Sequence, residues 1–91
     1  MFRGPAAREG KFFPDCRAVH TWFVPKPLDI LFLDASHRVL RTDEKVKPFR
    51  IRYEAGAVSV LELPGGCWGS LNAREKAALK RALPSISRNP D

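Results

Sequence analysis

The side chains best suited to chemistry lie between positions 16 and 34, where the chain reads CRAVHTWFVPKPLDILFLD. This stretch places a thiol, an imidazole, a hydroxyl and a carboxylate around an apolar run, at Cys16, His20, Thr21 and Asp29. A carboxylate that is buried without partners is costly. We therefore expect Asp29 to accept backbone N–H bonds at a turn, or to pair with an arginine, His20 or Thr21.

Cys16 and His20 are four residues apart, so they share one side of a strand if that strand begins early. Two ligands are too few for a zinc site, and a Cys–His nucleophile also needs an orienting group. The sequence therefore predicts no metal and no cofactor. The structural interpretation makes Cys16 a small buried hydrophobe and His20 a hydrogen-bonded imidazole.

Three functions are compatible with these residues, and the favoured one is a non-catalytic binding or accessory domain. Its small polar site comprises the cluster above, flanked by two strand arginines: Cys16, His20, Thr21, Asp29, Arg50 and Arg52. The first alternative is a hydrolase-like enzyme in which His20 is the general base and Asp29 orients it. That mechanism requires an exposed His20 within hydrogen-bond reach of the carboxylate.

The second alternative follows from charge, because the 91 residues contain 16 Lys and Arg against 10 Asp and Glu, a net charge of +6. This excess favours anionic partners, either a small molecule or a polyanion such as a nucleic acid. The central basic residues are Arg38, Arg41, Lys45, Lys47, Arg50 and Arg52, opposed by Asp43 and Glu44. Alternation puts Phe49 and Tyr53 on the other face from Arg50 and Arg52, so we favour a solvated face that protects a sheet edge.

Two cysteines cannot form a disulfide framework. The first residues lack the apolar segment of a secretory signal, and no apolar run approaches the roughly 20 residues of a membrane span. The sequence therefore predicts a cytoplasmic protein without a membrane span, whose thiols are reduced.

Short segments rich in β-branched and aromatic residues, separated by Pro, Gly and Asp, are typical of strands and turns. The expected strands are residues 11–13, 19–24, 28–33, 38–42, 49–53 and 57–63. Residues 34–37 (DASH) are the expected turn of a hairpin. In a regular strand 19–24, Trp22 and Phe23 would point to opposite faces.

Residues 71–83 have the composition of a helix, and Asn72 with Glu75 fits a capping box. Trp68 is expected to pack against this helix. We predict one domain over 1–91, with a loose arm at 1–10, a β core at 11–66, the helix at 71–83 and a tail at 84–91. The fold class is mainly β: a small twisted antiparallel sandwich or partial barrel of about five strands with one C-terminal helix.

The pattern of residues 14–66 resembles the bacterial and archaeal family called domain of unknown function 192. The matching features are a Cys, three residues and His-Thr, then Pro-Leu-Asp before a strand that ends in Asp, and later Leu-Glu-Leu-Pro with Gly. In this chain they are Cys16, His20, Thr21, Phe23, Pro27, Asp29, Asp34, Leu61, Glu62, Leu63, Pro64 and Gly66. The resemblance implies a compact, mainly β domain and no established activity.

Overall fold

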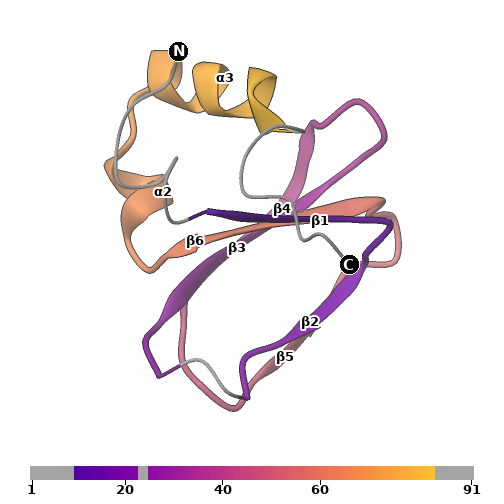
Figure 1. Ribbon diagram of the computed structural model, residues 1–91, viewed down its shortest axis with the longest axis vertical. Coiled ribbons are helices and arrows are strands. Elements are labelled where there is room, and N and C mark those ends of the chain that lie inside the picture. The colour runs from indigo at the N-terminus through magenta and orange to yellow at the C-terminus, as the bar shows by residue number, and fades with distance from the viewer. Residues whose placement is uncertain (1–9, 23–24, 84–91) are drawn as a thin grey trace.

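The computed structural model describes residues 10–22 and 25–83. Within these ranges the chain forms six strands and two short helices (Figure 1). The strands are β1 (Lys11–Pro14), β2 (Ala18–His20), β3 (Leu28–Leu33), β4 (Val39–Val46), β5 (Ile51–Tyr53) and β6 (Ser59–Pro64). The helices are α2 (Cys67–Ser70) and α3 (Ala73–Arg81).

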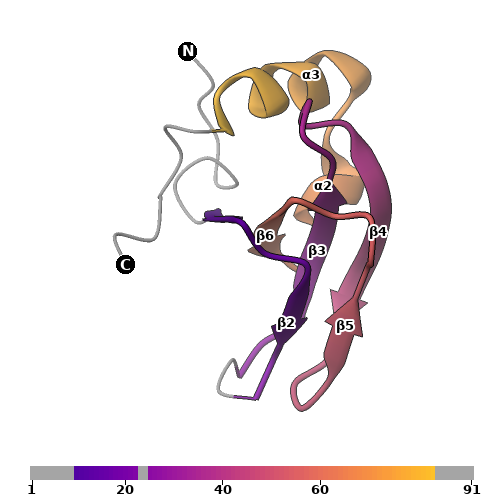
Figure 2. The ribbon, with the colours of Figure 1, turned by 90° about the vertical axis from the view of Figure 1, so that its right-hand side faces the viewer.

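The strands form two antiparallel sheets, one of four strands in the order β1-β6-β3-β4 and one that pairs β2 with β5. The helices lie on one side of the larger sheet and the β2–β5 pair on the other (Figures 1 and 2). This arrangement confirms the predicted mainly β fold and its sandwich-like packing, with no closed barrel in the described part of the chain.

Strand β3 is the centre of the larger sheet, because β6 and β4 pair with its two edges. Both of its faces are covered, which explains its nearly continuous apolar sequence. Leu31 and Leu33 face the helices, where they pack with residues of β1, β6, α2 and α3. Ile30 and Phe32 face the opposite way and pack against a second cluster that includes Val19 of β2.

The hairpin between β3 and β4 turns where the sequence predicts. Asp34 Oδ1 accepts hydrogen bonds from the backbone N–H groups of Ser36 at 2.8 Å and Arg38 at 2.9 Å. A short polar side chain that bonds the backbone two residues later is a typical turn former. Strand β4 then continues to Val46, four residues beyond its expected end at residue 42.

Helix α3 begins with the predicted capping box. Asn72 accepts from the Glu75 N–H at 2.8 Å, and Glu75 accepts from the Asn72 N–H at 2.9 Å. Leu79 and Leu83 are buried beside Trp68 in the cluster under the helices, as expected for Trp68. Helix α2 is absent from the sequence prediction, because four residues after Pro-Gly-Gly show no helical periodicity.

Three strand predictions were too long. The predicted strand 49–53 contains β5, which is only Ile51–Tyr53, and the predicted strand 57–63 begins two residues before β6, Ser59–Pro64. The third is the predicted strand 19–24. Strand β2 ends at His20, because Thr21 instead bonds to the loop after β4. Trp22 lies in a turn and is exposed. The prediction that Trp22 and Phe23 face opposite ways involves Phe23, which lies outside the described residues.

Candidate functional site

Asp29 is fully buried, and its carboxylate bonds to three backbone N–H groups. Oδ1 accepts from Lys45 at 2.8 Å and from Gly66 at 3.0 Å, and Oδ2 accepts from Trp68 at 2.8 Å. Both oxygens are therefore used within the fold. This geometry matches the first of the partners expected for Asp29, backbone donors at a turn.

These bonds join three parts of the chain that the sequence separates. Leu28 pairs with Val46 and Ile30 with Asp43, so Asp29 faces a β-bulge in β4. Lys45 lies in this bulge with φ 53°. Asp29 stabilises the bulge and the start of α2 together, because a carboxylate near a helix N-terminus satisfies unpaired N–H groups.

His20 lies on the other side of the larger sheet. Asp29 bonds to Trp68, which belongs to the cluster under the helices, whereas Val19 beside His20 packs in the opposite cluster. The His20 ring contacts Trp22 edge-on, with 6.1 Å between centroids. The sheet therefore separates His20 from Asp29, and the pair that the hydrolase-like alternative needs is not formed.

Cys16 lies before β2, and His20 ends that strand. The thiol donates to the Ala18 carbonyl at 3.1 Å, and the backbone N–H donates to the Val58 carbonyl at 3.0 Å. Cys16 also packs against the cluster around Phe32. These contacts give Cys16 a structural role, and none of them involves the imidazole of His20.

Thr21 is fully buried and fixes the loop that joins β4 to β5. Its hydroxyl donates to the Lys47 carbonyl at 2.8 Å and accepts from the Arg50 N–H at 2.9 Å. Its backbone N–H donates to the Arg50 carbonyl at 2.9 Å, and its carbonyl accepts from Phe49 at 3.1 Å. Four bonds from one residue hold the loop backbone in place, including Phe49 at φ 63°.

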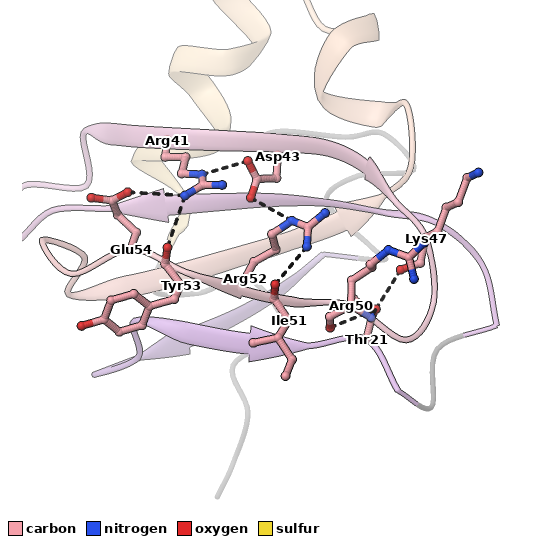
Figure 3. Close-up of polar contacts among 9 residues, drawn as sticks. All are labelled: Thr21, Arg41, Asp43, Lys47, Arg50, Ile51, Arg52, Tyr53 and Glu54. Carbon is pink, nitrogen blue, oxygen red and sulfur yellow. Dashed lines mark hydrogen bonds and ion pairs between the residues drawn. The ribbon is translucent and has the colours of Figure 1, made fainter.

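The loop borders an open groove of about 750 Å³ between β4 and β5 (Figure 3). Arg50 and Arg52 are the members of the predicted site that line it. Five basic and two acidic residues lie in its wall, an excess of three positive charges. The lining residues are Arg41, Thr42, Asp43, Glu44, Lys45, Val46, Lys47, Arg50, Ile51, Arg52 and Tyr53.

At one end of the groove, ion pairs around Asp43 and Arg41 connect β4 with β5 and the residue after it. Asp43 lies between two arginines, 2.9 Å from Arg41 Nε and 3.4 Å from Arg52 Nε. Its carboxylate is the main cause that raises the pKa of Arg41. Figure 3 shows both guanidinium groups bridging β4 and β5 above the strand backbone.

These arginines also protect the free edge of β5. Its carbonyls at Ile51 and Tyr53 point away from β2, since alternate residues of an antiparallel strand bond on opposite sides. Arg52 donates to the Ile51 carbonyl at 2.9 Å, and Arg41 donates to the Tyr53 carbonyl at 3.3 Å. The edge-protecting role expected for the basic face is therefore the role of Arg41 and Arg52.

The other end of the groove carries charge that no acid among the described residues neutralises. Lys47 and Arg50 are exposed, and among the described residues neither lies within ion-pair distance of a carboxylate. Arg50 Nη1 contacts the carbonyls of Pro48 and Phe49 at 3.3 Å, at the base of the same loop. Two cations on a fixed loop are thus available to a ligand.

Glu62 is a residue of interest that the site prediction omitted, although it belongs to the Leu-Glu-Leu-Pro motif. It lies with Lys11, Lys26 and three prolines around a hollow of about 250 Å³. Burial raises the pKa of its carboxyl, while the charges of Lys11 and His20 oppose that rise. The burial of Glu62 depends on the position of β6 between β1 and β3, which the motif alone does not reveal.

Two observations concern the class of protein. Among residues 10–22 and 25–83, no helix has the length and apolar character that crossing a bilayer requires. Within the same residues, no three His, Cys, Asp or Glu side chains gather as a metal site would require.

Comparisons with known proteins give one match. No curated protein and no solved structure matches the chain. A family model covers residues 5–80, which include every strand and nearly all of α3. The matching model is that of DUF192, described as an uncharacterized ACR. Because the match spans most of the sequence, the chain belongs to the DUF192 family.

Proposed function

We propose that this protein is a non-catalytic binding domain that holds an anionic ligand at the Lys47–Arg50 end of the β4–β5 groove. The observation that carries the proposal is the pair of cations, Lys47 and Arg50, without an acidic partner among the described residues. Binding sites gain affinity when the groups that contact the ligand are already held in place. Thr21 does this for the loop through its four bonds.

The side-chain chemistry favours a phosphate or carboxylate group. Arginine presents a planar fork of N–H donors that matches two oxygens of such a group, and lysine adds a compact positive charge. Arg52 lies further along the groove and is already paired with Asp43. We assign ligand contact to Lys47 and Arg50, and we assign positioning roles to Thr21 and Arg52.

The proposal narrows the site expected from sequence. Asp29 has both oxygens bonded to backbone donors, and the Cys16 thiol is bonded to the Ala18 carbonyl. A ligand that bound these groups would have to replace bonds that hold the fold together. The proposed site therefore retains Thr21, Arg50 and Arg52 from the prediction and adds Lys47.

Calorimetric titration of the full chain with tripolyphosphate tests the proposal. The Lys47→Gln/Arg50→Gln double variant is compared with Arg74→Gln/Arg81→Gln, which removes two exposed charges from α3. We expect the groove variant to bind about tenfold more weakly or worse, because a charge-assisted hydrogen bond contributes roughly 1.5–3 kcal/mol. The helix variant should bind as the natural chain does.

Equal weakening in both double variants would show that only the net charge matters, and the site would be withdrawn. The same holds if the natural chain shows no saturable binding. Melting curves of both variants serve as the folding control, since all four side chains are exposed.

A further inference from the structure

The outer face of the β2–β5 sheet presents a two-by-three array of side chains. Ala18 is opposite Tyr53, and His20 is opposite Ile51. Trp22 and Phe49 continue this register beyond the paired residues, and their rings meet edge-to-face with centroids 5.9 Å apart. Because Val19 packs inward and successive residues of a strand point to opposite faces, its neighbours Ala18 and His20 point outward.

Four of the six side chains in this array are large apolar or aromatic groups that are exposed. The exposed fractions are 42% for Trp22, 62% for Phe49, 63% for Ile51 and 54% for Tyr53. Figure 3 shows Ile51 and Tyr53 on the opposite side of β5 from the guanidinium groups of Arg41 and Arg52. Contiguous exposed apolar side chains of this kind mark interaction surfaces rather than ordinary solvated surface.

The charges around the array indicate what binds there. None of its six residues is acidic, and Phe49 lies in the same loop as Lys47 and Arg50. A ligand that covers the rings and passes over the end of this loop therefore reaches two cations that face the groove on the other side of β5 and that no described acid neutralises. A second copy of the chain is disfavoured as the occupant, because each copy carries a net charge of +6.

We infer that this face binds the bases of a single-stranded nucleic acid whose phosphates lie at Lys47 and Arg50. Proteins that bind single strands combine a basic path for the backbone with aromatic rings on which bases stack. Phe49 and Tyr53 are four residues apart along the strand direction, about 13 Å, and sheet surfaces of this type hold roughly two or three bases. The inference rests on the proposed function, since it assigns the ligand class of the same cations.

Fluorescence anisotropy with a labelled eight-nucleotide oligo(dT) tests the inference on the full chain. The variant Phe49→Ala/Tyr53→Ala removes two rings, and Leu40→Ala/Val58→Ala removes two exposed apolar side chains elsewhere. We expect about a tenfold loss of oligo(dT) affinity for each ring removed, because stacking of one base on an aromatic ring has this order of effect. The Leu40→Ala/Val58→Ala variant should bind like the natural chain.

Tripolyphosphate separates this inference from the proposed function. The Phe49→Ala/Tyr53→Ala variant should retain tripolyphosphate binding, whereas Lys47→Gln/Arg50→Gln should lose both ligands. Oligo(dT) should also quench Trp22 fluorescence, and the Trp22→Phe variant identifies that signal against Trp68. Tripolyphosphate has no base to stack and should leave the signal unchanged.

Unchanged oligo(dT) affinity in Phe49→Ala/Tyr53→Ala would overturn the inference and leave the anion site standing. Tighter binding of a hairpin duplex than of the single strand would also overturn it, since paired bases cannot stack on these rings. So would a dimer of the natural chain that Phe49→Ala/Tyr53→Ala converts to a monomer. If Lys47→Gln/Arg50→Gln still bound tripolyphosphate normally, the proposed function itself would fail.

Discussion

The two sides of the four-stranded sheet use charged residues in opposite ways. On the helix side, the Asp29 carboxylate is fully buried and both of its oxygens accept from backbone donors of β4 and the start of α2. On the β2–β5 side, Lys47 and Arg50 are exposed on a loop that a buried hydroxyl fixes. A charged side chain such as Asp29, which is buried and hydrogen-bonded to backbone groups, thus stabilises the fold. A charged side chain such as Lys47 or Arg50, which is exposed and unpaired among the described residues, is available to bind a ligand.

The largest loss of stability should come from a substitution on the helix side of the sheet, at Asp29. Asp29→Ala leaves three N–H donors without their acceptor. At roughly 1–3 kcal/mol for each buried unsatisfied group, we expect a loss of about 3 kcal/mol or more in the free energy of unfolding. Urea denaturation measures it, with exposed Glu44→Ala as the control.

Asp29→Asn keeps one acceptor oxygen and should lose less stability than Asp29→Ala. A loss of less than about 1 kcal/mol for Asp29→Ala, the order of a single net hydrogen bond, would show that Asp29 does not stabilise the fold through its backbone bonds. It would contradict the difference drawn between the two sides of the sheet.

The next largest effect should come from Thr21, on the β2–β5 side of the sheet. It should appear both in stability and in ligand binding. Thr21→Val keeps the shape of the side chain but removes the hydroxyl that bonds Lys47 and Arg50. We expect a loss of about 1–3 kcal/mol in stability, together with weaker tripolyphosphate binding. Thr21→Ser should restore both, whereas a stable Thr21→Val protein with normal binding would refute the positioning role.

A substitution in helix α3 tests whether the helix side of the sheet stabilises the fold without contributing to ligand binding. Asn72→Ala removes the capping box and should cost about 1 kcal/mol of unfolding free energy. Tripolyphosphate affinity measured below the melting transition should not change. A clear loss of affinity would mean that the two sides are coupled through the sheet.

The smallest effect concerns Glu62. Burial raises the pKa of its carboxyl above the ordinary value of 4.5. Between that value and the higher folded value, the folded state binds more protons than the unfolded state. Stability therefore falls as pH rises through this window and is fully present below it.

Glu62→Gln removes this titration, so the variant should become more stable relative to the natural chain as pH rises above 4.5. Thermal melts between pH 4 and 7 measure the difference. A gap between the two proteins that stays constant over this range would contradict the burial of Glu62.

The sequence predicts the parts of the fold that depend on local signals. The apolar run of β3 matches residues 28–33, the Asp34 turn forms, and the Asn72–Glu75 capping box is present. Each signal involves residues only a few positions apart. Helix α2 is missed because its N–H groups are satisfied by Asp29, 37 and 39 residues away from Gly66 and Trp68.

The site is only partly predictable for the same reason. Sequence alternation correctly separates Phe49 and Tyr53 from Arg50 and Arg52, but it does not say which face of β5 is covered. In the structure the arginines point into the groove and the apolar residues are exposed. Asp43 neutralises Arg41 and Arg52, whereas no described acid neutralises Lys47 and Arg50. This difference depends on how β4 lies opposite β5.

Mapping of a tripolyphosphate titration by backbone amide NMR tests the central claim most directly, because it reports on both sides of the sheet in one sample. The claim predicts saturable shifts of the amides of residues 47 and 49–52, while those of Gly66 and Trp68, held by Asp29, stay in place. Saturable shifts centred on residues 66–68 with none in the 47–52 loop would contradict it.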